Sequence, residues 1–257
     1  MGTRQTPMVV VRDSPYVVAA VEAATPNIRR LWLRPLAGAL AFRPGQYVQL
    51  GDAGARLAPR SYSIANAPRS DGLISLLVAR VTGGATSAWI SDTLADGDEV
   101  AVTGPYGTFV DDSLSTAPAL YLAAGAGFAP VRALLEAALS DGRRGSLTLV
   151  VSARTAADVI DAGLLTTWQR QDPRFRFVRT LTRERHTPLG RVPDILSSLG
   201  VPLPGQDVFI AGAPGFVLAC TRAVRALGVR PTALHTEAFY LEPKPWLDDV
   251  IQAARET

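Results

Sequence analysis

The chain has 257 residues, of which 47% are hydrophobic and 19% charged, and its formal net charge is +3. This composition excludes a disordered chain and predicts a globular protein with one large domain or two of ordinary size. The single cysteine, Cys220, excludes an intrachain disulfide and a four-cysteine iron–sulfur cluster within this chain. Its neighbours have helical spacing, so we expect it to be a buried small apolar residue.

The sequence also bears on whether the protein binds nucleic acid, crosses a membrane or is secreted. No segment combines clustered basic residues with aromatic ones, so we expect no nucleic-acid partner. No window reaches the ~18 uninterrupted apolar residues of a membrane span. The opening residues hold only three consecutive valines before Arg12, where a signal peptide needs roughly 7–15 apolar residues. We therefore expect a soluble, cytoplasmic protein with no membrane span.

Residues 8–113 predict an N-terminal antiparallel β-barrel. Short apolar runs follow one another about every ten residues and are separated by Gly and Pro, which is typical of closed all-β domains. The expected strands are 8–12, 16–24, 28–35, 46–50, 61–68, 73–81 and 99–107. The polar stretch 111–118, which ends in proline, predicts a short linker.

Residues 116–240 predict a doubly wound α/β domain with a five-stranded parallel sheet. Nearly continuous apolar runs alternate with segments of helical periodicity, as expected for a sheet covered on both faces. The expected strands are 119–125, 146–153, 175–181, 207–212 and 232–239, and the clearest helices are 131–140 and 216–227. Ligands of such a sheet bind beyond the carboxyl ends of its strands.

Two motifs in the barrel part suit a dinucleotide. In Arg60-Ser61-Tyr62-Ser63, residues two apart share a face of the strand, so the arginine and the tyrosine point the same way. An arginine fork suits a pyrophosphate and a tyrosine ring suits stacking on a flat heterocycle, although an exposed strand face could carry the same residues. In GGATS (83–87), the free amides before a helix suit an anion, although an ordinary capped helix explains the pattern almost as well.

Two further motifs lie at strand ends of the α/β part. GAGFAP (125–130) joins the first strand to its helix, and AGAP (211–214) follows the fourth strand. Glycines at such places let a dinucleotide pyrophosphate approach the backbone closely. The histidines contribute little: His186 lies in a polar loop, and His235 lies in an expected strand, where a packed core residue is the expected role.

Taken in order, these motifs resemble one known family. RSYS (60–63), GGATS, GPYG (104–107), GAGFAP, AGAP and EAF (237–239) follow one another as in the ferredoxin–NADP(+) reductase superfamily. The resemblance covers roughly residues 8–240. It implies that the barrel binds FAD, that the α/β domain binds a nicotinamide dinucleotide, and that the flavin receives hydride.

The resemblance also implies roles for single residues. Arg60 would contact the flavin pyrophosphate, Tyr62 would pack on the isoalloxazine, and Ser63 would lie near flavin N5. Glu237 and Phe239 would approach the flavin from the side opposite Tyr62, so the implied catalytic residues are Ser63, Glu237 and Phe239. The implied cofactor-binding residues are Arg60, Ser61, Tyr62, Ser63, Gly84, Thr86, Ser87, Gly125, Gly127, Phe128, Ala129, Pro130, Ser152, Arg154, Arg183, Gly212 and Pro214.

The choice of nicotinamide rests on the arginines after two strands. Members of the family that prefer the 2′-phosphate often place arginines where Arg154 and Arg183 stand, next to Ser152. No acidic residue stands directly at the end of the expected strand 146–153 to accept a ribose diol, although Asp158 is near. NADPH is therefore favoured, NADH stays open, and arginines that merely face solvent are the alternative.

The resemblance implies an NAD(P)H-dependent flavoprotein reductase that passes electrons to a separate ferredoxin or oxygenase component. Two alternatives stay open: a flavin or quinone reductase that serves small diffusible acceptors, and a non-catalytic electron-transfer subunit of a larger complex. Family subunits of the last kind carry a C-terminal cysteine cluster, which this chain lacks. No metal site is expected.

Two features depart from the family pattern. Many members have threonine at the place of Ala126 and cysteine at the place of Ala211, close to the nicotinamide. Many also end soon after the Phe239 position, whereas this chain continues through 241–257. Helical spacing in that tail predicts a short helix that packs against the protein and restricts access to the flavin; a solvated extension is the alternative.

Overall fold

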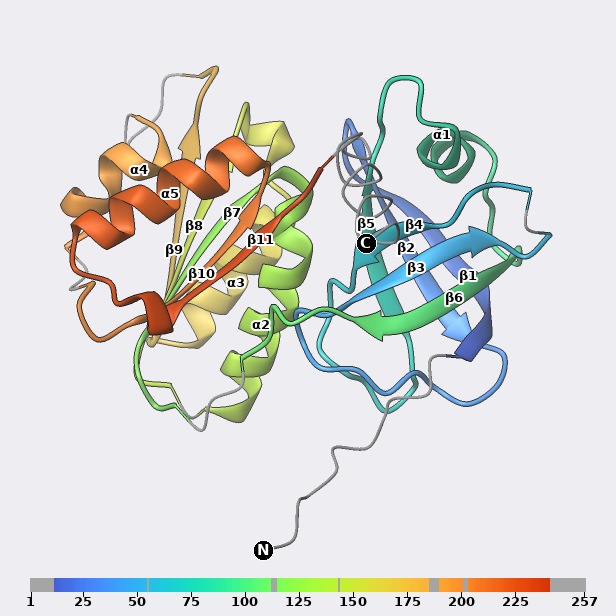
Figure 1. Cartoon of the computed structure of the whole chain (residues 1–257), viewed down its shortest axis with the longest axis horizontal. Helices are drawn as coiled ribbons and strands as arrows, with labels where there is room; N and C mark the ends of the chain where they lie inside the picture. The colour runs from blue at the N-terminus through green and yellow to red at the C-terminus, as the bar shows by residue number, and fades with distance from the viewer. Residues whose placement is uncertain are drawn as a thin grey trace, which may run out of the picture.

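The computed structural model describes residues 12–54, 56–111, 115–142, 144–184, 190–200 and 203–240. The described chain forms an antiparallel β half followed by an α/β half, which lie side by side in Figure 1. The expected strand 8–12 lies outside the described residues except for Arg12. His186 and the expected packed tail 241–257 also lie outside them.

The N-terminal half is a curled six-stranded antiparallel sheet with one helix. Its elements are β1 (Arg12–Thr25), β2 (Ile28–Pro35), β3 (Tyr47–Asp52), β4 (Arg60–Ser63), β5 (Ile74–Ala79), α1 (Ala85–Asp92) and β6 (Glu99–Tyr106). The strand order is β4-β3-β6-β1-β2-β5. An isolated antiparallel bridge between Ile64 and Leu76 links the two edges of this sheet, because Ile64 directly follows β4 and Leu76 lies in β5. The predicted antiparallel barrel is therefore confirmed.

Alternating side chains fill the barrel interior. Leu31 and Leu33 lie two apart on β2 and are fully buried together with Val48 and Leu50 of β3, as the period of two along a strand requires. Helix α1 contributes Ile90 to the same core. Burial of these side chains fixes the face of every strand and therefore the direction in which the RSYS motif points.

The C-terminal half is a five-stranded parallel sheet of order β11-β10-β7-β8-β9. Its strands are β7 (Ala119–Ala124), β8 (Leu147–Ala153), β9 (Phe175–Leu181), β10 (Asp207–Gly212) and β11 (Leu234–Ala238). Its helices are α2 (Phe128–Asp141), α3 (Ala162–Gln171), α4 (Val192–Ile195) and α5 (Pro214–Ala226). Short 3₁₀ turns complete it: η1 (Gly125–Gly127), η2 (Ala156–Asp158), η3 (Leu196–Leu199) and η4 (Pro231–Ala233).

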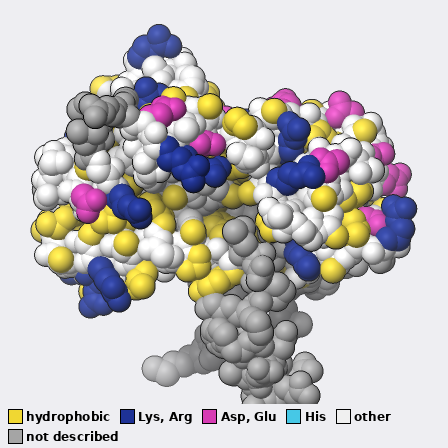
Figure 2. All heavy atoms as spheres, turned by 90° about the horizontal axis from the view of Figure 1, so that it is seen from above, with side chains coloured by type: hydrophobic (Ala, Val, Ile, Leu, Met, Phe, Trp, Pro, Cys, Tyr) yellow, Lys and Arg dark blue, Asp and Glu magenta, His cyan; other side chains and the backbone are white. Residues whose placement is uncertain are grey.

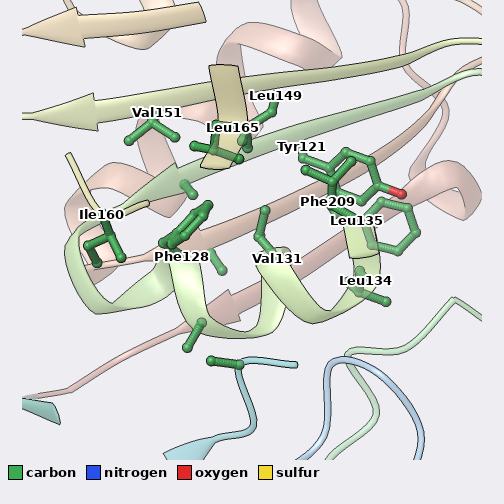
Figure 3. Packing of buried hydrophobic residues seen from close by; sticks show 14 of the residues in the cluster. Tyr121, Phe128, Val131, Leu134, Leu135, Leu149, Val151, Ile160, Leu165 and Phe209 are labelled. Atoms are coloured by element: carbon green, nitrogen blue, oxygen red, sulfur yellow. The ribbon is translucent and has the colours of Figure 1, made fainter. Parts of the chain in front are cut away.

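Helices cover both faces of this sheet, which confirms the doubly wound prediction. On one face, Tyr121 and Phe209 pack against Val131 and Leu135 of α2, as Figure 3 shows. The other face packs against α4 and α5. Cys220 of α5 is fully buried there, as predicted, and burial raises the pKa of its thiol to about 12.

The strand order contains one topological switch point. From β7 the chain moves through β8 to β9 on one side, then returns to β10 and β11 on the other side. Such a switch leaves a crevice beyond the carboxyl ends of the two central strands, here β7 and β10. The GAGFAP and AGAP motifs follow these two strands, so the fold brings them together.

One apolar cluster joins the two halves. Ile28, Ala65 and Leu77 of the barrel half belong to the same buried cluster as Phe128 and Leu134 of α2. Helix α2 accordingly lies on the barrel side of the α/β half (Figure 1). On the face shown in Figure 2, basic and acidic side chains are interspersed over both halves and form no broad field of one sign.

Candidate active site

The RSYS strand runs from the surface into the barrel. Arg60 and Ser61 are exposed, Tyr62 is half-buried, and Ser63 is 5% exposed. Tyr62 packs against the barrel core, and burial raises the pKa of its hydroxyl to about 12. Within the described part of the chain, the Arg60 guanidinium makes one hydrogen bond, in which its Nη1 donates to the carbonyl of Pro59 at 3.2 Å. Most of its donors therefore remain for an anion outside the barrel.

The start of α1 lies next to this strand. The Thr86 hydroxyl donates to the carbonyl of Ala58 at 3.1 Å, two residues before Arg60. The Ser87 hydroxyl donates to the carbonyl of Gly84 at 3.0 Å. Because both hydroxyls already serve the fold, the backbone N–H groups of the first helical turn are the donors left for a phosphate. No side chain caps this helix start, and its first turn holds no acidic residue.

The switch point is built from glycines. A Cβ atom on Gly127 would overlap the backbone of Ala211 and Gly212, so the GAGFAP turn lies directly against the end of β10. Gly125 has φ +56°, and a Cβ atom there would meet no atom of the described residues within 4 Å. Gly125 is also exposed at the end of β7, so a dinucleotide could approach its backbone there without meeting a side chain.

The end of β11 is fastened to the same place. The Phe239 N–H donates to the carbonyl of Gly212 at 2.9 Å, and the Phe239 ring packs against the cluster that joins the two halves. Glu237 pairs in register with Ala211, and partial burial raises the pKa of its carboxyl. His235 stacks on Phe209 with ring centroids 4.5 Å apart, which confirms its predicted packing role.

The two arginines expected at the 2′-phosphate lie side by side. The Arg183 N–H donates to the carbonyl of Arg154 at 2.8 Å, and both side chains are exposed. The carboxylate of Asp158 accepts hydrogen bonds from the amide and hydroxyl of Thr155 and lies 3.7 Å from Arg154 Nε. Asp158 is therefore occupied in closing its own turn.

A surface cavity of about 500 Å³ opens beside these arginines. It is lined by Leu181, Thr182, Arg183, Glu184, Gly190, Arg191 and Asp194. Two of its lining residues are arginines and two are acidic, and it lies beyond the carboxyl end of β9, on the side of the sheet where ligands of doubly wound folds bind.

One aromatic contact near Ser63, between Tyr47 and Tyr106, could not be predicted from the sequence motifs. Tyr47 of β3 pairs in register with Ser63, and its ring lies 5.5 Å from the ring of Tyr106. A Cβ atom on Gly107 would come within 3.0 Å of the Tyr47 ring, so the GPYG turn packs closely on it. The alternation of QYVQL could have suggested Tyr47, but its partner on β6 follows only from the strand order.

Two family models cover most of the described chain. The oxidoreductase FAD-binding domain matches residues 16–110, and the oxidoreductase NAD-binding domain matches residues 121–222. The chain is 34% identical over 235 residues to the reductase subunit of an aromatic O-demethylase from an Amycolatopsis species, covering 89% of this chain and 70% of that protein. The chain belongs to the ferredoxin–NADP(+) reductase superfamily.

Other proteins similar to this chain are also reductases. Ferredoxin–NADP reductase B of Sorangium cellulosum is 33% identical, with 86% of this chain and 96% of that protein covered. The reductase component of the naphthalene 1,2-dioxygenase and salicylate 5-hydroxylase systems of Ralstonia is 31% identical, with 87% and 68% covered. The crystal structure of an Amycolatopsis cytochrome P450 reductase has a TM-score of 0.81 at 34% identity, with 89% and 70% covered.

The reductase is thus a flavoprotein whose barrel half binds FAD and whose α/β half binds a nicotinamide dinucleotide. The exposed Arg60 fork, the uncapped start of α1 and the open space beside Gly125 fit these two groups. When bound, the flavin accepts hydride and releases electrons singly. Among the described residues, no group of three or more His, Cys, Asp or Glu side chains could hold a metal ion. None of the described helices is long and apolar enough to cross a bilayer.

Proposed function

We propose that this reductase takes hydride from NADPH, with NADH as a weaker donor, and passes the electrons through FAD to a separate ferredoxin or oxygenase component. One observation carries the proposal: the two dinucleotide sites adjoin within a single chain. Ala65, two residues beyond Ser63, shares a buried cluster with Phe128 and Ala129 in the first turn of α2. A flavin on the RSYS strand and a nicotinamide at the switch point would therefore face one another.

Single residues in the barrel take their proposed roles from their places. Arg60 would neutralise the flavin pyrophosphate, because its fork is exposed beside the start of α1. Tyr62 would pack on the flavin ring and remain neutral, because its pKa lies far above the physiological range. The buried Ser63 hydroxyl would hydrogen-bond near the atom that receives hydride.

The α/β half would orient the nicotinamide. The residues from Gly125 to Pro130 would receive its pyrophosphate at the start of α2, and Gly212 and Pro214 would guide the ring toward the flavin. Phe239 would lie where the ring must arrive, since its amide is bonded to Gly212. Glu237 would supply a carboxyl whose proton is held more tightly than usual.

The preference for NADPH rests on the exposed arginine pair. Arg154 and Arg183 lie together at the carboxyl edge of the sheet, Arg191 lines the adjoining cavity, and Ser152 is half-buried one strand position inside. Asp158, the nearest candidate for a ribose diol, is occupied by Thr155. Guanidinium groups suit a phosphate dianion, whereas an NADH site requires an acceptor for the two ribose hydroxyls.

The separate acceptor follows from what the chain contains and from its relatives. With one buried cysteine, the chain has no four-cysteine cluster that could receive single electrons. The relatives from Ralstonia and Amycolatopsis are named as reductase parts of multi-component systems. A reductase that serves small diffusible acceptors is the second candidate. The cytoplasmic location and the domain boundaries 8–113 and 116–240 stay predictions.

The acceptor is tested on the FAD-loaded protein. After anaerobic reduction with NADPH, the reduced flavin is mixed separately with a [2Fe–2S] ferredoxin, a quinone and free flavin. The proposal expects the ferredoxin to reoxidise the protein fastest at equal concentration, with a salt-dependent rate if charged surfaces guide the encounter. Faster reoxidation by quinone or free flavin would instead establish the second candidate. An inert reduced protein would contradict both.

A further inference from the structure

Asp161 has an unusual backbone for its residue type. Among the described residues it is the only non-glycine with a left-handed conformation, at φ 56°. This conformation is unfavourable for L-residues because of the Cβ atom, and Asp and Asn tolerate it best. Asp161 also stands at the N-cap of α3, yet its side chain makes no capping hydrogen bond there. The residue is therefore held in a conformation that the helix itself does not require.

The carboxylate of Asp161 joins the two halves instead. Nη2 of Arg30 donates to both carboxylate oxygens at 2.9 and 2.8 Å, and Arg30 belongs to β2 of the barrel, 131 residues away. Nε of Arg132 on α2 donates to Oδ2 at 2.7 Å. The Arg30 and Asp161 side chains are each 12% exposed and that of Arg132 is 7% exposed, so solvent screens these contacts weakly.

Arg132 connects this cluster to the segment that follows β4, the strand proposed to bind the flavin. Its Nη1 donates to the carbonyl of Ala65 at 2.5 Å, two residues beyond Ser63, and to Glu136 at 3.1 Å. The Glu136 carboxylate also accepts the N–H of Ala67 at 2.9 Å. Helix α2 is thereby bonded to the segment that continues β4, while its own start is the turn that receives the nicotinamide dinucleotide. The cluster thus lies between the two cofactor sites.

The cluster does not have to hold the halves together. The apolar cluster that contains Ile28 and Leu77 already joins the barrel to α2. Apolar packing is non-directional, whereas hydrogen bonds from two guanidinium groups to one carboxylate constrain angles as well as distances. Small displacements matter for hydride transfer, since a misplacement of about 1 Å can cost about 100-fold in rate.

We propose that Asp161 is a positioning residue that sets how the nicotinamide-binding half faces the flavin strand, acting through Arg30 and Arg132. This role rests on the proposed function, because it presupposes that hydride passes between the two halves. In this left-handed conformation the carboxylate of Asp161 contacts an arginine from each half.

The test is Asp161→Asn, which keeps the shape and tolerates the left-handed backbone but loses the charge. We expect the rate of flavin reduction by saturating NADPH to fall about 10-fold or more. The affinity for FAD should change less than about 2-fold. Hydrogen exchange of peptides covering 65–67, measured without nicotinamide, should become faster. The matched control is Asp172→Asn, which removes a carboxylate–Arg174 pair inside one half and should leave all three quantities unchanged.

A second variant covers the case in which Asp161→Asn does not fold. Arg30→Gln leaves Asp161 paired with Arg132, and we expect the same slower reduction and faster exchange. Wild-type reduction rates and exchange in both variants would overturn the proposal. So would a loss of rate that only follows lost FAD. If wild-type protein is itself not reduced by NADPH, the proposed function fails, and unchanged exchange at 65–67 would then overturn the alignment role separately.

Discussion

The two dinucleotide sites of this reductase are built from different materials. The proposed flavin site consists of side chains of β4, from the exposed Arg60 at one end to the buried Ser63 at the other. The proposed nicotinamide site instead consists of backbone that carries no side chain, at Gly125 and Gly127. Substitutions of side chains should therefore affect mainly FAD binding, whereas substitutions that add a side chain should affect mainly the nicotinamide dinucleotide. A substitution in one site should leave binding at the other site unchanged.

The largest effect is expected where a side chain is added to the bare backbone. In Gly127→Ala, the new Cβ would overlap the backbone of Ala211 and push the GAGFAP turn away from β10. We expect flavin reduction by NADPH to slow about 100-fold or more, while FAD content stays at wild-type level. Stopped-flow reduction and the flavin-to-protein ratio measure the two quantities.

The same substitution at a glycine with free space is the control. A Cβ atom on Gly163 of α3 would meet nothing within 4 Å in the parts of the chain that the structure describes, so Gly163→Ala should keep the wild-type rate. Alanine in a helix is preferred over glycine by about 1 kcal/mol, so this variant should also be slightly more stable. Equal effects of the two substitutions would contradict the close turn at Gly127.

Removal of a side chain that contacts FAD should weaken FAD binding and leave NADPH binding unchanged. Arg60→Ala deletes one charge-assisted contact worth about 1.5–3 kcal/mol, so the dissociation constant of FAD should rise about 10–150-fold. Once saturated with FAD, the variant should bind NADPH as the wild type does. Arg34→Ala, another exposed arginine on the barrel, is the control and should retain FAD normally. Unchanged FAD affinity in Arg60→Ala would remove that residue from the flavin site.

A smaller effect is expected at the edge of the α/β half. The double variant Arg154→Ala, Arg183→Ala should raise the KM for NADPH about 10-fold or more, the loss of one or two charge-assisted contacts, and leave the KM for NADH nearly unchanged. The kcat should change little, because binding lost equally from ground and transition states alters KM alone. Equal losses with both donors would show that these arginines do not recognise a 2′-phosphate.

The smallest effect concerns stability and pH. Burial raises the pKa of Glu237 above its ordinary value of 4.5, so the unfolded chain ionises this carboxyl first. As the pH rises from the pKa of Glu237 in the unfolded chain to its higher pKa in the folded chain, ionisation favours the unfolded chain. The free energy of unfolding therefore falls over this pH range. Glu237→Gln lacks that cost. Its free energy of unfolding should exceed that of the wild type at about pH 7 and equal it below about pH 4. A wild type that is more stable than the variant at neutral pH would contradict a carboxyl whose burial is uncompensated.

Local patterns were sufficient for much of this fold. The apolar run 207–212 coincides with β10, and the spacing around Cys220 predicts α5, because hydrophobic burial follows strand and helix periods. Helix α3 is absent from the sequence prediction, since only Leu165 of its residues is buried and its apolar signal is weak. The strand expected at 61–68 ends at Ser63, where the chain turns to bridge Ile64 with Leu76.

The site was less predictable than the fold. Ordered motifs indicate the RSYS strand and the two glycine turns, because phosphate binding imposes short local patterns. The contacts of Asp161 have no such signature. Arg30 and Arg132 lie 131 and 29 residues away in sequence, and only the packing of the two halves brings them to one carboxylate.

The most direct measurement is anaerobic mixing of the FAD-loaded wild-type protein with one equivalent of NADPH, followed through the visible flavin absorbance. If the two sites face one another as proposed, one equivalent should bleach the flavin within a single turnover, and C4-deuterated NADPH should bleach it more slowly. Flavin that stays oxidised in the presence of bound NADPH would contradict hydride transfer between the two halves of this chain.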